Sequence, residues 1–277
     1  MGCADPSMNM KQMAKDLKVN RETLRLAIRE DLCLIPYKHR ITQLVPEKGR
    51  ALRVIRGRKL LKHHEENPDK VNIWTDEKSW FVDSAKNQQN DRFLAYCRDE
   101  VPDKHRSTKP VSAMMLGVVG SDGQVMPPLW MEKGAKVDSK IYIANLEKVK
   151  VWLDETYTKR GKKYVFMQDG APSHTSEKTI TWMEKNFPDF WRPEEWPPYS
   201  PDCNPLDFNI WGFVERKACA LPHSSVAALQ ESVNRAWGEL LTEEHVKKTC
   251  ASAWKRIDLM IKAKGYPFEP GMKKNKN

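Results

Sequence analysis

The sequence predicts an α/β fold, because short apolar runs that suit buried strands alternate with amphipathic runs that suit helices. The predicted strands lie at 71–75, 80–82, 111–119 and 164–168. The predicted helices of the same region lie at 139–160, 176–187, 205–220, 225–240 and 243–260. Hydrophobic residues make up 40% of the 277 residues, which is enough to give such a domain a packed core.

Positive charge is concentrated at the two ends of the chain. The formal net charge of +10 divides into +7 for residues 1–70, +5 for residues 255–277 and −2 for residues 71–254. Basic ends suit the binding of a polyanion, while a separate acidic region can carry out chemistry. Solubility alone is the other explanation of this charge, and the composition leaves it open.

A small helical unit is predicted at residues 9–31. Its first helix ends before Asn20, which is a candidate N-cap of the second helix. On the second helix, Arg21, Arg25 and Arg29 recur every four residues and therefore share one face. This pattern favours a helix-turn-helix whose basic second helix enters a DNA major groove. A helical hairpin with a solvated basic face is the alternative.

A basic linker is predicted between this unit and the α/β body. From Glu47 onward it has the pattern of a helix with Leu52 and Ile55 on one face, and a turn at residues 67–70 ends it. Its positive side chains suit contacts with DNA phosphates. The DNA-binding residues predicted in this linker are Lys38, Arg40, Arg50, Arg53, Arg56, Arg58 and Lys59.

The predicted domains are 1–35 for the helix-turn-helix unit, 36–70 for the basic linker, 71–262 for the α/β body and 263–277 for a disordered basic tail. No run of about 18 apolar residues occurs, so no membrane-spanning helix is expected. The polar N-terminus lacks the apolar stretch of a signal peptide. The six cysteines form no C-x-x-C pair and no zinc-finger spacing, which favours buried or incidental thiols in a reducing compartment.

Three aspartates stand in local frames that suit a metal site. Asp76 and Asp169 each follow an apolar strand-like run, and Asp207 opens a helix-like run. In sheets with crossover helices, ligand sites gather at strand ends. Magnesium takes hard oxygen ligands, and two such ions about 3.5–4 Å apart can clamp the attacking and leaving oxygens at phosphorus. The three frames therefore point to a two-metal phosphoryl-transfer site.

Each aspartate taken singly also has a structural explanation. Asp76 can be a turn residue at a strand end, and Asp169 begins an Asp-Gly pair of the kind common in turns. If Asn204 caps a helix that begins at Pro205, Asp207 falls at the third helical position, where an acid is electrostatically favoured. Only the residues around the three acids separate these explanations from a catalytic one.

Three sequence blocks around the aspartates resemble the catalytic blocks of mariner-superfamily transposases. The first, at 74–82, is WTDEKSWFV; the second, at 168–175, is QDGAPSHT; the third, at 196–211, is WPPYSPDCNPLDFNIW. The third block is long and highly specific, and the three together cover about residues 70–220. A weaker likeness to the family's second DNA-binding subdomain and linker covers residues 9–66.

The resemblance implies an RNase H-like catalytic domain, a mixed sheet flanked by helices, with two Mg²⁺ ions held by Asp76, Asp169 and Asp207 and Mn²⁺ as a substitute. It implies a metal-dependent DNA endonuclease and strand transferase, which cuts DNA at transposon ends and transfers the freed 3′-hydroxyl to target DNA. The implied partner is double-stranded DNA, as terminal inverted repeats and as target. A homodimer is left open, no membrane partner is implied, and the expected location is the nucleus.

The sequence departs from the family pattern in two ways. The 37 residues between Asp169 and Asp207 slightly exceed the spacing of the best-known members, which suggests a subfamily. One helix-turn-helix is expected before the α/β body, where full-length members carry two. Two other hypotheses therefore stay open: a transposon-derived DNA-binding protein that no longer transposes, and a structure-selective nuclease on the same fold.

Two further residues, Glu77 and His174, lie inside the resembling blocks. Glu77 is next to Asp76 and is expected to support the site or the fold. His174 matches a family position and is expected at the surface or at the entry of a helix, with a contact near the metals as the alternative.

Overall fold

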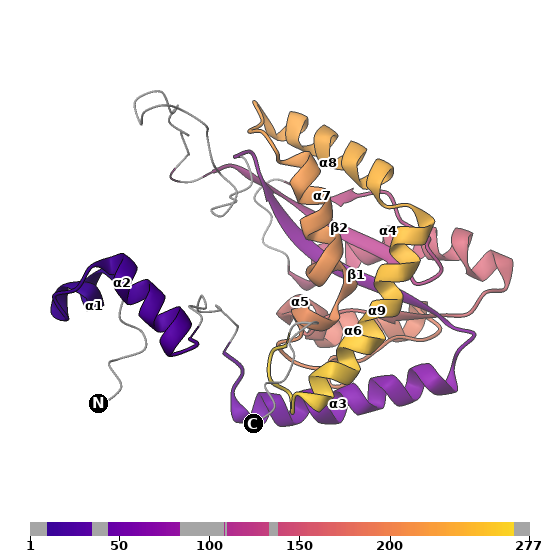
Figure 1. Cartoon of the computed structure of the whole chain (residues 1–277). Helices are drawn as coiled ribbons and strands as arrows, with labels where there is room; N and C mark the ends of the chain where they lie inside the picture. The colour runs from indigo at the N-terminus through magenta and orange to yellow at the C-terminus, as the bar shows by residue number, and fades with distance from the viewer. Residues whose placement is uncertain (1–9, 35–43, 84–107, 109, 133–137, 269–277) are drawn as a thin grey trace. The chain divides into compact units, whose positions relative to one another are not determined.

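The computed structural model of the chain describes residues 10–34, 44–83, 108, 110–132 and 138–268. It divides into two compact units, Met1–Thr42 and Gln43–Asn277 (Figure 1). The sequence predicted a boundary at residue 70, and the structure differs because helix α3 (Glu47–Glu66) packs into the second unit. The predicted linker is therefore, for most of its length, a part of the larger unit.

The first unit contains helix α1 (Met10–Asp16) and helix α2 (Arg21–Leu26), and a π-helical turn η1 (Ala27–Asp31) follows them. The side chain of Asn20 accepts a hydrogen bond from the Glu22 N–H at 2.8 Å, so the predicted N-cap is confirmed. This cap separates the two helices and fixes where the second one begins.

The second unit holds the sheet and the remaining helices. The strands are β1 (Val71–Phe81), β2 (Ser112–Gly120), β3 (Leu129–Trp130) and β4 (Tyr164–Met167). The helices are α4 (Ser139–Thr156), α5 (Pro172–Thr175), α6 (Glu177–Asn186), α7 (Trp211–Ala218), α8 (Val226–Leu240) and α9 (Glu243–Lys262). Short helical turns are η3 (Thr158–Arg160), η4 (Pro201–Cys203) and η5 (Leu206–Ile210). The predicted α/β alternation is confirmed.

Within the described residues, a four-stranded mixed sheet has the order β3-β2-β1-β4. Strand β1 pairs antiparallel with β2 and parallel with β4. The sequence predicted two short strands where the structure has the single strand β1. The polar residues 76–79 that suggested a break continue the ladder with β2, since backbone pairing does not depend on an apolar side chain.

The two faces of the sheet carry separate hydrophobic clusters because side chains alternate along a strand. Trp74 and Trp80 of β1 belong to the cluster that includes residues of α7, α8 and α9. Ile73 belongs to the opposite cluster with residues of α4 and α6. Helices therefore cover both faces of the sheet (Figure 1).

Helix α3 packs against α9, and its buried residues are Gly49, Arg53, Gly57 and Leu60. A Cβ atom at Gly57 would lie 2.7 Å from the Met260 side chain, so glycine permits the close approach of the two helices. Of the two residues predicted to share one face, Leu52 is half-buried and Ile55 is 63% exposed.

The described part of the chain continues beyond α9 to Phe268. Tyr266 lies under the guanidinium of Arg50, with 4.3 Å from its Cζ to the ring centroid. Residues 269–277 of the predicted tail lie outside the described residues. No helix in the described ranges is long and apolar enough to cross a membrane.

Candidate active site

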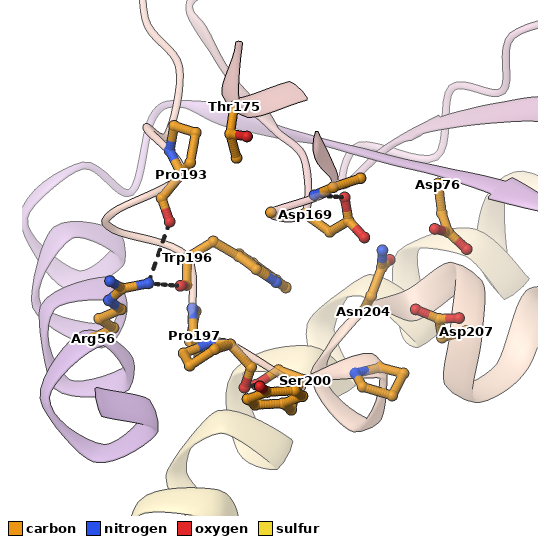
Figure 2. Close-up of a pocket in the computed structure, with 15 residues that line it drawn as sticks. Arg56, Asp76, Asp169, Thr175, Pro193, Trp196, Pro197, Ser200, Asn204 and Asp207 are labelled. Atoms are coloured by element: carbon orange, nitrogen blue, oxygen red, sulfur yellow. Dashed lines mark hydrogen bonds between the residues drawn. The ribbon is translucent and has the colours of Figure 1, made fainter. Parts of the chain in front are cut away.

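The three predicted aspartates line one cavity of about 600 Å³. Strand β1 supplies Asp76, the segment after β4 supplies Asp169, and η5 supplies Asp207. Figure 2 shows Asp76 and Asp207 facing each other, with the carboxylate of Asp169 turned toward the same space. The structure thus brings together residues that lie up to 131 positions apart in the sequence.

Sheet register places Asp76 beside Asp169. Trp74 is the parallel partner of Met167, and each aspartate follows its strand residue by two positions on the same face. The Thr75 hydroxyl donates to the Met167 carbonyl at 2.8 Å and ties the two strands at this point. Asp76 lies inside β1 and not at its end, so the turn explanation for it is excluded.

Asn204 connects the segment that carries Asp207 to β1. Its amide nitrogen donates to the Thr75 carbonyl at 3.2 Å, and its amide oxygen accepts from the Leu206 N–H at 3.1 Å. The turn that begins there, η5, is π-helical. Such turns occur frequently at functional sites because they aim a side chain differently from a regular helix. Asn204 thereby holds Asp207 opposite Asp76.

Trp211 orients Asp76 by donating its indole N–H to the carboxylate at 2.6 Å. Gly117 of β2 is the register partner of Asp76. A Cβ atom there would lie only 2.4 Å from the Trp211 ring. Glycine inside a strand therefore makes room for the indole, which is one of the reasons for glycine at such a position.

His174 lies against Asp169 and Glu77. Its Nδ1 is 2.7 Å from Asp169 Oδ1 and its Nε2 is 3.2 Å from Glu77 Oε1, and only 3% of its side chain is exposed. Burial alone would lower the pKa of His174, but hydrogen bonds and charges of the two carboxylates outweigh it and raise the pKa to about 10. The imidazole is therefore a cation that donates to both acids. His174 lies in the short helix α5, as the helix-entry role expects, and it also contacts the residues beside the site. Its burial excludes the surface role.

The electrostatics of the three aspartates are unequal. Burial raises the pKa of Asp76, and the charges of Asp207, Glu77 and Asp169 add to this effect. Burial and the charge of Asp169 raise the pKa of Asp207. For Asp169, burial is outweighed by His174 and by the Ala171 N–H, so its pKa is lowered. On the side of the cavity formed by Asp76 and Asp207, burial and neighbouring acids therefore disfavour the ionised carboxylates unless a cation is close.

This charge pattern suits a divalent cation. Crowded, buried carboxylates with raised pKa values are stabilised by a nearby positive charge. Among the described residues, no three His, Cys, Asp or Glu side chains are grouped closely enough to hold a metal ion by themselves. Magnesium sites commonly use one or two carboxylates together with water and substrate phosphates. The donors present thus fit a site that the phosphodiester of a substrate would complete.

Arg53 does not lie where a DNA contact requires it. Its side chain is fully buried, and its guanidinium donates to the Tyr199 carbonyl and to Asp202, the latter at 2.6 Å. The prediction that Arg53 binds DNA is therefore wrong. The basic sequence pattern of α3 does not indicate that one of its arginines, Arg53, holds this helix against the loop before Asp207.

The other predicted DNA contacts have different surroundings. Arg56 lines the cavity, and one of its nitrogens donates to the Trp196 carbonyl at 2.8 Å. Arg58 and Lys59 are exposed, and Lys59 pairs with Glu195.

The remaining predicted contacts begin with those of the first unit, where Arg25 pairs with Glu22. Arg21 and Arg29 are exposed, Arg50 is half-buried, and Lys38 and Arg40 lie outside the described residues.

Two supporting contacts were not predicted from the sequence. Trp211 belongs to the third resembling block, but nothing in the block indicates that its indole reaches Asp76. Tyr142 stacks on His174 with ring centroids 4.1 Å apart and donates its hydroxyl to Gln168 at 2.6 Å. Its only sequence signal was a place in an amphipathic helix.

The fold matches the RNase H-like fold of a solved transposase catalytic domain. The Mos1 mariner transposase catalytic domain aligns with a TM-score of 0.64 and 18% identity, over 83% of this chain and 100% of that one. The Mos1 mariner paired-end complex with Mn aligns with a TM-score of 0.78 and 19% identity, over 96% of this chain and 77% of that one. The predicted mixed sheet with flanking helices is confirmed.

Curated transposase sequences match a part of this chain. The Tcb1 transposase of Caenorhabditis briggsae is 31% identical over 107 residues, which are 39% of this chain and 37% of the relative. The Tc1 transposase of Caenorhabditis elegans is 29% identical over 106 residues, 38% of this chain and 37% of the relative. Over these matched residues the chain is similar to transposases of the Tc1/mariner family. It spans just over a third of the length of the curated relatives it matches, and no family model matches it.

Proposed function

We propose that this protein is a DNA transposase, which cleaves DNA at transposon ends and transfers the freed 3′-hydroxyl to target DNA. The observation that carries the proposal is the convergence of Asp76, Asp169 and Asp207 on one cavity. Strands and a helical turn hold these side chains, and phosphoryl transfer depends mainly on such rigid positioning and on charge stabilisation.

Asp76 and Asp207, which face each other, are two of the proposed ligands, and Asp169 is the third. Mg²⁺ or Mn²⁺, when bound, would stabilise charge on the attacking and leaving oxygens. The protein's own part is to hold the carboxylates still: Trp211 orients Asp76, and His174 orients Asp169. Mos1 paired-end complexes have been solved with Mn and with Mg, which supports the same ions here.

Double-stranded DNA is the proposed partner. Mos1 forms a paired-end complex with a left transposon end, which supports terminal repeats as one substrate. Exposed Arg21 and Arg29 of the first unit and Arg58 of α3 are the proposed phosphate contacts, because phosphate contacts position a protein on DNA without reading its sequence. A homodimer and a nuclear location stay predictions.

A cleavage assay on the DNA repeats that flank the gene tests the proposal. A plasmid with the inverted repeats that flank the gene is expected to be cut at the repeat ends in Mg²⁺, and a plasmid with scrambled repeats is expected to stay intact. Binding of the repeats without any nicking would favour a transposon-derived DNA-binding protein instead. Cutting of both plasmids would favour a structure-selective nuclease.

Replacing His174 by alanine is expected to lower cleavage by about 10- to 100-fold, because an outer partner that orients a metal-binding carboxylate has an effect of this size. The Mg²⁺ concentration for half-maximal cleavage should rise, and His174→Gln, which keeps one donor, should recover part of the loss. The control is His223→Ala, since that ring contacts the Ala218 carbonyl at 2.8 Å. An unchanged Mg²⁺ requirement together with a lower melting temperature would assign His174 to folding alone.

A further inference from the structure

A half-exposed tyrosine stands in the wall of the aspartate cavity. Tyr199 lines the cavity with 49% of its surface exposed. Its ring rests on α3, where a Cβ atom at Gly49 would lie 3.3 Å from two of the ring carbons. The ring is thus supported from one side and open to a ligand on the other.

The backbone holds Tyr199 in a conformation that few side chains adopt. Its φ is +53°, in the left-handed region. Such residues persist where the surroundings determine them, and they cluster at ligand sites. Here the surroundings are the buried guanidinium of Arg53, which donates to the Tyr199 carbonyl and to Asp202. A buried ion pair inside the second unit therefore fixes the backbone that presents the Tyr199 ring to the cavity.

The groups that line the cavity follow one another as the parts of a nucleotide strand would require. Figure 2 shows Arg56 on one side, the aspartates on the other, and Trp196 and Pro197 between them. One Arg56 nitrogen donates to the carbonyls of Pro193 and Trp196, at 3.2 and 2.8 Å, which fixes its positive charge at the cavity wall. A phosphate suits the arginine, a flat base suits the aromatic wall, and a second phosphate suits a metal at the aspartates.

We propose that Tyr199 stacks on an unpaired nucleobase of the DNA strand that enters the aspartate cavity, while Arg56 holds a phosphate of the same strand. The base must be unpaired, because bases inside a duplex are covered by their stacking neighbours. The cavity of about 600 Å³ has the size of a small-ligand site. The inference rests on the proposed function, because it takes the strand at the aspartates to be the one that is cut.

Binding without cleavage tests the proposal. The full chain carrying Asp169→Asn is titrated in Mg²⁺ with three fluorescent duplexes: one blunt, one with a three-nucleotide 3′ extension, and one whose extension is abasic. The extension with bases is expected to bind more tightly than the other two. Adding Tyr199→Ala should weaken binding of that duplex by about 5- to 150-fold, the range for stacking of one base, and leave the blunt duplex unchanged. Tyr199→Phe keeps the ring and should stay within about twofold.

Two outcomes would overturn the stacking role. One is equal affinity for the extensions with and without bases, which is read with Tyr199 in place and so does not depend on how the variant folds. The other is an equal loss for blunt and extended duplexes in Tyr199→Ala. Failure of the proposed function shows elsewhere, as absent cleavage of the repeats by the unaltered chain, and leaves this binding comparison intact.

Discussion

Replacing Asp169 by asparagine is expected to lower Mg²⁺-dependent DNA cleavage by at least about 10³-fold, because a lost metal ligand removes several kcal/mol of transition-state stabilisation. Binding of DNA should change little, since Asp169 lies in the cavity and the exposed arginines lie elsewhere. The fold should persist as well. An amide oxygen can still accept from the Ala171 N–H, whose distance to Asp169 is 3.0 Å.

The matched control is Asp258→Asn. Asp258 is an acid on α9 that pairs with Lys262 and has 43% of its side chain exposed. An exposed pair of this kind contributes about 0–1 kcal/mol to stability, and it lies outside the cavity lining. Cleavage and DNA affinity, measured side by side for both variants, separate chemistry from binding. Normal cleavage by Asp169→Asn would remove the carboxylate site as the origin of the activity.

Replacing Arg53 by leucine is expected to destabilise the second unit by about 3–5 kcal/mol, because Asp202 would be left as a largely buried charge without its partner. The melting temperature should fall by roughly 6–20 °C, at about 2–4 °C for each kcal/mol in a unit of this size. Thermal or denaturant unfolding of the purified chain measures the change, and no DNA is needed.

Lys59→Leu is the control from the same helix. Lys59 pairs with Glu195 at the surface, with 59% of its side chain exposed, and its loss should cost about 0–1 kcal/mol. The double variant Arg53→Leu, Asp202→Leu should be more stable than Arg53→Leu alone, because it removes the second charge too. Equal stability of Arg53→Leu and Lys59→Leu would mean that the buried pair contributes little to docking α3.

The sequence was sufficient for the α/β fold and for most element positions, and it pointed to three aspartates that the structure brings to one cavity. The aspartates stood out through the resemblance of the blocks around them, above all the long block around Asp207. The contacts that hold these acids in place could not be predicted from the sequence. Trp211 reaches Asp76 only because Gly117 leaves space on another strand, and such a coincidence exists only in three dimensions.

For helix α3, a strong sequence pattern led to a wrong prediction. Its positive residues predicted a DNA-tracking linker, and charge periodicity cannot distinguish an exposed arginine from one with a buried partner. Arg53 meets Asp202, 149 residues further along the chain. The flanking Gly49 and Gly57 that let the helix approach so closely also lower its apparent helical and apolar character.

The pairing of Trp74 with Met167 has a consequence for how this site can be lost. The distance between Asp76 and Asp169 is set by counting residues along two neighbouring strands. A single inserted or deleted residue between Val71 and Asp76, or between Tyr164 and Asp169, would move one carboxylate by about 3.3 Å and turn it to the opposite face. A gene copy can therefore keep all three aspartates and every resembling block and still lose the arrangement of this site.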